Sequence, residues 1–285
     1  SARSIEALRH QLGLDRPLHI QFGRYLAGLL KGDLGRSIKT HERVSVELLS
    51  RFPATIELTL ASMALAMIMG LSAGLLSAVR RGSLLDYLGM TASLVGVSMP
   101  IFWLGLILIM TLALAAGLFP VSGRISSTLF IPSATGLYLV DSLLVGDVRA
   151  FGDALWHLVL PGVTLGTVPA AVIARMTRSS MLEVLREDYV RTAWAKGLLE
   201  RAVVLRHGLK NAFIPILTVI SLQFGYLLGG AVITETIFAW PGMGNMAITA
   251  VNNNDFPVLQ AVVFFFTVLI VGMLILLTMI LQHQQ

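Results

Sequence analysis

The chain has 285 residues, of which 55% are hydrophobic and 13% are Asp, Glu, Lys or Arg; this is about half the charged share of an ordinary soluble domain, so lipid is the expected solvent for much of it. The absence of cysteine excludes a disulfide framework, a thiolate nucleophile and a cysteine-based metal site. The net charge of +5 does not indicate nucleic-acid binding, because the basic residues lie between apolar blocks, where membrane topology places them.

Five apolar stretches are long enough to cross a bilayer core of about 30 Å as helices. In chain order they are 54–79, 88–118, 155–174, 212–234 and 258–281. Four contain no charged residue, and the first contains only Glu57, near its outer end, where a position at the membrane interface is the simplest interpretation. A charge at a helix centre costs about 2.5–3.5 kcal/mol, so this distribution predicts an all-α membrane protein.

Proline and glycine mark special places in these spans. Proline favours kinks, and it occurs at Pro100, Pro161, Pro169 and Pro215. Two glycine pairs have the spacing that lets helices approach closely in lipid, and they are Gly70 with Gly74 and Gly225 with Gly229. Such pairs serve packing within one chain or between two chains.

The charges of the connecting loops predict the orientation. Loop 79–87 is basic, and loop 175–210 carries eight basic and four acidic residues, whereas loops 119–154 and 235–257 are acidic on balance. The positive-inside rule places the first two loops and the C-terminus in the cytoplasm. Residues 1–53 then lie outside although nine are basic and five acidic, so we expect an upstream sixth span in the intact protein. The predicted organisation is an extracytoplasmic segment 1–53, a transmembrane domain 54–281, and a cytoplasmic loop 175–211 within it.

The loop 175–211 is too long and too patterned for a simple connector. Ser180 and Glu183 have capping-box spacing, which predicts a helix start. An apolar stripe follows at Met181, Leu185, Tyr189 and Ala193, and Gly197 is placed to end the helix in the left-handed conformation. Such a helix can lie on lipid headgroups, pack on the chain's own helix ends or dock into a partner. The acidic residues argue against lipid as its sole partner.

Motifs for chemistry are absent from the sequence. It contains no G-x4-G-K-[ST] phosphate loop and no H-E-x-x-H motif, and its six histidines are scattered. We therefore predict no catalytic residue, no metal site and no cofactor in this chain.

Several long motifs occur in a fixed order. They are RSSMLEVL at 178–185, EDYVRTA at 187–193, AKG at 195–197, HGLKNA at 207–212, ETIFAWPGMG at 235–244 and DFP at 255–257, with LGLDRP at 12–17 and GDLGRS at 32–37 near the start. Together they resemble the permease subunits of ABC importers of the peptide/nickel class, and in particular the B-type subunits of dipeptide permeases. The resemblance extends over essentially the whole chain, and it implies the type I permease fold.

The resemblance also implies site residues. In that family the cytoplasmic loop is similar to a coupling helix, which binds a groove on a separate ATPase. The matching residues here are Arg186, Glu187, Asp188, Tyr189, Arg191, Thr192, Ala193, Lys196, Gly197 and Glu200. Two positions depart from the pattern, because Trp194 replaces a usual Arg and Leu199 replaces a capping Ser. The departures leave the details of the docking surface open.

At the outer side, Trp240, Pro241 and Gly242 match a motif expected at the docking face of a binding protein or at the outer gate, although Trp240 is equally placed as an interfacial aromatic anchor. The implied partners are a second permease subunit, two cytoplasmic ABC ATPases that bind ATP and Mg, an extracytoplasmic solute-binding protein, and membrane lipid. The implied function is import of dipeptides or short oligopeptides across the bacterial inner membrane. Nickel or glutathione permeases, and in another class a secondary transporter or channel, stay open as alternatives.

Overall fold

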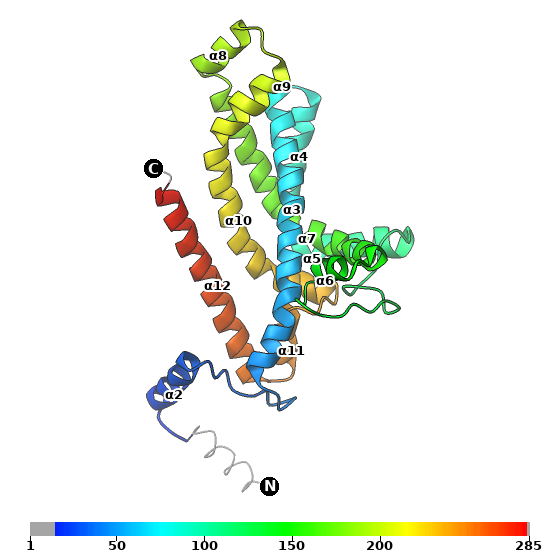
Figure 1. Ribbon diagram of the computed structural model, residues 1–285, viewed down its shortest axis with the longest axis vertical. Helices are drawn as coiled ribbons and strands as arrows, with labels where there is room; N and C mark the ends of the chain where they lie inside the picture. The colour runs from blue at the N-terminus through cyan, green and yellow to red at the C-terminus, as the bar shows by residue number, and fades with distance from the viewer. Residues whose placement is uncertain (1–14, 284–285) are drawn as a thin grey trace.

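The structure is an elongated helical bundle with two distinct ends. The computed structural model describes residues 15–283, and within this range the regular structure is helical apart from one isolated bridge between Arg36 and Arg43. Figure 1 shows α8 (Asp188–Ala195) and α9 (Glu200–Ala202) at one end, here called the α8 end. The opposite end, here called the α11 end, carries α2 (Leu18–Leu30) and α11 (Met243–Asn252).

The chain crosses the bundle in four continuous passes, and in five if one bent pair of helices counts as a pass. Four are made by α3 (Val44–Val79), by α7 (Val148–Val184), by the run of α9, the π-helix η2 (Val203–Leu209) and α10 (Lys210–Ile237), and by α12 (Phe256–His283). Each is long and apolar enough to span a membrane, and a fifth span requires the bent pair that starts with α4 (Leu84–Ser98). The predicted all-α membrane fold is therefore confirmed.

The predicted span 88–118 is broken in the middle. After α4 the chain is extended at Met99 and turns by 107° into α5 (Ile101–Leu108) and the π-helix η1 (Ile109–Ala115). Pro100 explains the break, because it lacks an N–H and disfavours helical geometry at the preceding residue. The other predicted prolines, Pro161, Pro169 and Pro215, lie inside helices that continue through them.

The bend creates a lobe on the side of the bundle. In Figure 1 this lobe contains α5, α6 (Tyr138–Val145) and the first part of α7. Asp141 holds the turn before α6 together: its carboxylate accepts hydrogen bonds from the amides of Thr135 and Gly136 and from the Thr135 hydroxyl. Burial raises the pKa of Asp141, but these hydrogen bonds outweigh it and leave the pKa below its ordinary value.

The core lies where α3 packs along α7. A methyl group on Gly70 would come within 2.7 Å of the Ala170 carbonyl oxygen, and one on Gly74 would overlap the Ala174 carbonyl. The first glycine pair therefore permits packing within the chain. Gly225 and Gly229 differ, because a methyl on Gly225 would meet only the tip of a methionine and one on Gly229 would meet nothing within 4 Å.

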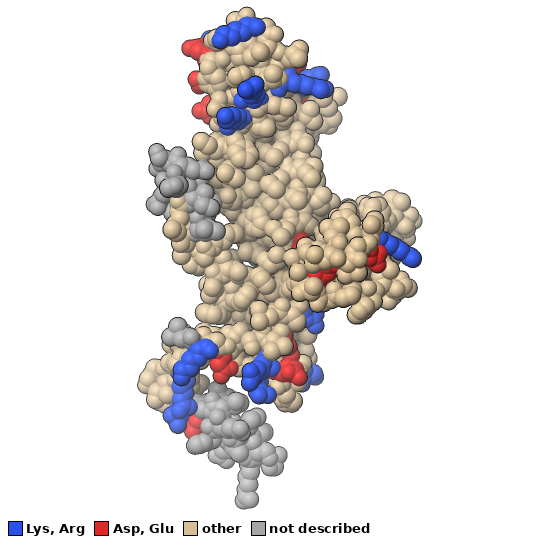
Figure 2. Space-filling view, in the orientation of Figure 1, with Lys and Arg blue, Asp and Glu red and all other residues tan. Residues whose placement is uncertain are grey.

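The first long helix begins earlier than the apolar block predicts, at Val44 instead of residue 54. Val44 and Leu48 are buried against α11 and the start of α12, so tertiary packing extends the helix beyond the membrane segment. Figure 2 shows that Lys, Arg, Asp and Glu gather at both ends and on the lobe, while the bundle between is free of them on this face.

Candidate functional site

The loop after α7 folds into a small helical unit at the α8 end. α7 ends at Val184, and α8 begins at Asp188 with Glu187 as its N-cap residue. Val190 and Ala193 face inward and pack against Val203, with exposed fractions of 0%, 5% and 0%. One face of α8 is thus held by the protein, and the other faces are free for a partner.

The predicted coupling residues are brought together on this unit. All but one of them are exposed, namely Arg186, Glu187, Asp188, Tyr189, Arg191, Thr192, Lys196, Gly197 and Glu200. Ala193 is the buried exception, at a place where a larger side chain would push α8 away from Val203. The Tyr189 hydroxyl accepts a hydrogen bond of 2.9 Å from the Asn211 amide, which ties α8 to the start of α10.

Gly197 makes the turn that the sequence predicts. Its φ is +74°, in the left-handed region that favours glycine, and no atom lies within 4 Å of the place where a Cβ would be. α9 then starts at Glu200, and its N-cap residue Leu199 has a side chain that forms no capping hydrogen bond. The departure from a capping Ser therefore leaves this start uncapped.

The predicted helix start at Ser180 is wrong. Ser180 lies inside α7 and is buried, and Met181 belongs to the main core. The capping-box spacing also fits the interior of a helix, so it could not locate the boundary. Sequence reasoning also did not assign the exposed apolar side chains of Trp194, Leu198 and Leu199, which are 46%, 39% and 80% exposed beside the coupling residues.

A partly buried ion pair fixes the base of this unit. The Arg178 guanidinium donates two hydrogen bonds to the Asp86 carboxylate, of 2.7 and 2.8 Å, and joins α7 to the start of α4. Asp86 also accepts a hydrogen bond from the Gly82 amide in the turn after α3. Both cytoplasmic loops of the prediction are thus linked at one end of the bundle.

The second candidate region is a buried polar cluster near the α11 end. Glu235, at the end of α10, is fully buried; its carboxylate accepts hydrogen bonds from the Thr55 hydroxyl (2.7 Å) and the Asn245 amide (3.0 Å). A methyl group on Gly242 would overlap this carboxylate. Glu235 therefore sets the shape of the turn between α10 and α11.

Trp240 sits in the same cluster and is fully buried, with its indole N–H donating 2.8 Å to the Ala54 carbonyl. Gly242 is buried and Pro241 is half-buried. A buried ring is not placed as an anchor in lipid headgroups, and in this conformation it offers no surface to a docked protein. Roles of Trp240, Pro241 and Gly242 in docking or in the outer gate stay predictions.

Glu57 is enclosed by the protein, and its predicted place near the membrane interface stays a prediction. It is buried, and it forms an ion pair with Arg124 from the lobe while also accepting a 2.8 Å hydrogen bond from the Leu139 amide. The Arg124 guanidinium lies 3.9 Å from the Tyr138 ring centre. The signals in the sequence were the lone acidic residues Glu57 and Glu235 beside apolar spans.

The segment before α3 is anchored to the turn between α11 and α12. The Asp255 carboxylate accepts hydrogen bonds from the Ser37 hydroxyl and from the amides of Ile38 (3.2 Å) and Lys39 (3.3 Å). Burial raises the pKa of Asp255, but these hydrogen bonds outweigh it and keep the pKa below its ordinary value. The motif at 32–37 and the motif at 255–257 are thus in contact. The first three residues of the third motif, at 12–17, lie outside the described residues.

Within the described part of the chain, no group of three or more His, Asp or Glu side chains is arranged to hold a metal ion. The chemistry that the two regions offer is recognition and movement: an exposed helical unit at one end and an interlocked cluster at the other.

Comparison with known proteins agrees with this arrangement. The family described as "Binding-protein-dependent transport system inner membrane component" matches residues 70–285. The di/tripeptide transport system permease protein DppB of Pseudomonas aeruginosa is 56% identical over 255 residues, which cover 90% of this chain and 76% of that protein. The dipeptide permease DppB of Escherichia coli K12 is 48% identical, with 90% and 78% covered, and the glutathione permease GsiC of Salmonella paratyphi A is 42% identical, with 93% and 78% covered.

Solved structures show the same fold. An amino acid ABC transporter chain matches with a TM-score of 0.59 at 15% identity, covering 84% of this chain and 94% of its own. A chain of the MetNI methionine ABC transporter matches with a TM-score of 0.60 at 18% identity, covering 84% and 96%. The chain therefore belongs to the inner membrane components of binding-protein-dependent transport systems, the multi-pass permease subunits of ABC importers.

Proposed function

We propose that this chain forms one half of the translocation path of an ATP-driven importer for dipeptides or short oligopeptides. Its 56% identity to a di/tripeptide permease over most of both chains supports the substrate class. A second permease subunit completes the path, two separate ATPases bind ATP and Mg, and an external binding protein delivers the peptide at the α11 end.

The single observation that carries the mechanism is the free outer surface of α8. The helix is rigidly seated through Val190 and Ala193, and it presents charged and aromatic side chains away from the bundle. When ATP closes the partner ATPases, force on α8 passes to α7 through the short turn 185–187 and to α10 through Tyr189 and Asn211. The interlocked cluster around Glu235 lies at the far end of α10, where that movement has to open or close the path.

The test is uptake of a labelled dipeptide into vesicles that contain the complete transporter. Gly197→Val should abolish uptake while ATP hydrolysis continues, because a β-branched residue cannot adopt φ of +74° without strain of about 1–3 kcal/mol and α8 is then misdirected. Gly146→Val is a matched control, since Gly146 has nearly the same φ, +76°, and open surroundings but ends α6 in the lobe, away from the coupling unit. Normal uptake in the Gly197 variant, or uptake without any nucleotide, would rule the mechanism out.

Substrate class is tested by competition. Unlabelled dipeptides should suppress uptake at lower concentrations than glutathione, and nickel should have no effect. A transporter that prefers glutathione would place this chain with relatives such as GsiC instead.

A further inference from the structure

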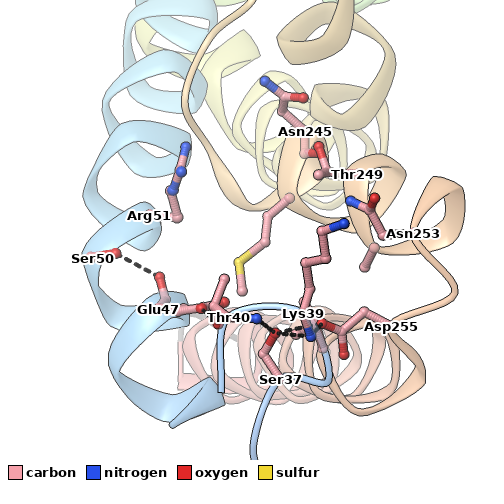
Figure 3. Close-up of a pocket in the computed structure, with 13 residues that line it drawn as sticks. Ser37, Lys39, Thr40, Glu47, Ser50, Arg51, Asn245, Thr249, Asn253 and Asp255 are labelled. Atoms are coloured by element: carbon pink, nitrogen blue, oxygen red, sulfur yellow. Dashed lines mark hydrogen bonds between the residues drawn. The ribbon is translucent and has the colours of Figure 1, made fainter. Parts of the chain in front are cut away.

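A polar pocket at the α11 end has no role in the function proposed above. Its volume is about 280 Å³, and three separate segments form it: the chain before α3, the first turns of α3, and α11 with the turn that follows (Figure 3). Its polar lining includes Lys39, Glu47, Arg51, Asn245, Thr249 and Asn253.

Two cations in this pocket have no side-chain partner in the described part of the chain. The side chains of Lys39 and Arg51 form neither an ion pair nor a hydrogen bond with any described residue. Glu47 lies one helical turn before Arg51, but its carboxylate accepts a hydrogen bond from the Thr40 hydroxyl instead of pairing with Arg51. Figure 3 shows Lys39 extending into the cavity near Asn253, with Arg51 across from it on α3. Two unpaired positive charges around one cavity favour an anion between them.

The backbone positions of both cations are fixed in advance. The amide of Lys39 donates to Asp255 at 3.3 Å and to the Ser37 hydroxyl at 3.2 Å, so the base of its side chain is held against the α11–α12 turn. Arg51 stands on the rigid first part of α3, next to the buried Leu48. A ligand therefore orders two side chains but no backbone, which lowers the cost of binding.

The remaining lining selects the kind of anion. The Asn253 side chain is free to bond an amide group, and the Thr249 and Ser50 hydroxyls line the pocket while donating to the Asn245 and Glu47 carbonyls. Two carboxylates also line the pocket: Asp255 is bonded to the Ser37 hydroxyl and to the Ile38 and Lys39 amides, whereas Glu47 accepts only from the Thr40 hydroxyl among the described residues. Such a mixture suits a small zwitterion with a carboxylate, an amide and an ammonium group. A cavity at the small end of the roughly 300–1,000 Å³ range of ligand pockets fits a peptide of two residues.

We propose that this pocket binds a short zwitterionic peptide directly on the permease, with the peptide carboxylate between Lys39 and Arg51 and its ammonium group toward Glu47. The inference rests on the proposed function for its substrate class, but it assigns a peptide site to the permease itself, separate from that of the external binding protein.

The experiment measures peptide binding to the purified transporter in nanodiscs without the external binding protein. The probes are the dipeptide Ala-Ala, its C-terminal amide and its N-acetyl derivative. Calorimetry measures the affinity of each probe. Amidation removes the group that meets two cations, so it should weaken binding about tenfold or more, and acetylation should weaken it less. Lys39→Met and Arg51→Met should each weaken Ala-Ala binding about tenfold, as expected for loss of one charged hydrogen bond.

Arg43→Met is the matched control, because it removes one positive charge from the same exposed segment outside the pocket lining, and its affinity should stay within about twofold of wild type. Equal binding of Ala-Ala and its amide overturns the proposal. Unchanged Ala-Ala binding in both pocket variants also overturns the proposal. The same holds if those variants weaken only the docking of the external binding protein.

The outcomes separate this site from the proposed function. ATP-driven dipeptide uptake with no direct peptide binding overturns the site and leaves the function standing. Direct binding that depends on Lys39 and Arg51, without dipeptide uptake in the complete transporter, supports the site and overturns the function. Each variant is first compared with wild type by thermal unfolding, so that loss of the fold is not read as loss of binding.

Discussion

At the scale of single residues, the charges that matter most are those removed from both water and lipid. Glu57 and Arg124 are both less than 10% exposed, and each contributes to the same junction between α3 and the lobe. Removing one member of such a pair leaves a buried charge without its partner, which costs far more than the pair itself contributes. The Glu57–Arg124 pair therefore fixes the position at which the lobe packs on α3.

Arg124→Met should lower the free energy of unfolding by about 3–5 kcal/mol, because Glu57 is then buried without its counter-ion. The measurement is thermal or denaturant unfolding in detergent. The double variant Glu57→Leu with Arg124→Met should be more stable than Arg124→Met alone, since it removes both charges. If the double variant only adds a second loss, the two side chains do not form an energetic pair.

Substitution by alanine should affect stability differently in the two glycine pairs. Gly70→Ala should destabilise the protein by about 1–3 kcal/mol, because its methyl group would meet the Ala170 carbonyl and Ile173 where α3 touches α7. Gly229→Ala has open space and should be neutral or slightly stabilising, since alanine is the better helix former. Unfolding curves of the two variants in the same detergent compare them; equal destabilisation would contradict the packing assigned to Gly70.

At the scale of elements, two anchors connect segments that lie far apart in the sequence. Asp255 holds the segment before α3, and Arg178 with Asp86 joins α7 to α4. Both anchors use a carboxylate that accepts several hydrogen bonds, so both depend on the carboxylate being ionised.

The Asp255 anchor should weaken in acid. Because folding lowers the pKa of Asp255, its contribution is fully present above the ordinary aspartate pKa of about 3.9 and is lost as the pH falls through the lower folded value. Hydrogen exchange at the Ile38 and Lys39 amides, compared between wild type and Asp255→Leu at each pH, measures this. The difference in protection should be large at pH 7 and should shrink below about pH 4. A difference that does not change with pH would show that the charge of Asp255 is irrelevant to the anchor.

Replacing Arg178 by lysine or alanine should lower the stability of the protein. Arg178→Lys cannot reproduce the two parallel hydrogen bonds to Asp86, so it should recover only part of the stability lost in Arg178→Ala. The loss in the alanine variant should be about 2–3 kcal/mol, below that for a fully buried pair, because the Arg178 side chain is partly exposed. Unfolding in detergent gives both values, and full recovery by lysine would mean that charge alone suffices.

At the scale of the whole molecule, the proposed function gives the two ends separate tasks. The α8 end carries the exposed coupling unit, and the α11 end carries the cluster around Glu235 and the peptide pocket. The bundle between them is bounded by apolar side chains, as expected for lipid contact (Figure 2).

The orientation of these ends can be measured with single cysteines, because this chain contains none. Leu199→Cys, at an 80% exposed position of the α8 end, should react with a membrane-impermeant thiol reagent only in inverted vesicles. Phe130→Cys, at an 88% exposed position of the lobe, should react only in intact spheroplasts. The reverse pattern would place the coupling unit outside the cell and contradict the proposed function.

The sequence by itself determined the membrane fold and the exposed turn at Gly197. These follow from local rules: apolar length, loop charge and the backbone freedom of glycine. It did not locate the end of α7, because the Ser180–Glu183 spacing is compatible with a helix interior as well as with a helix start.

Only the tertiary structure decided which polar side chains meet. Glu57 and Arg124 are 67 positions apart and Ser37 and Asp255 are 218 apart, so no local pattern could pair them. Burial of Trp240 likewise depends on α3 passing beside the turn after α10. The sequence sets where each helix can form in lipid, whereas the packing of those helices brings charges from distant segments close enough to pair, which offsets the cost of removing them from water.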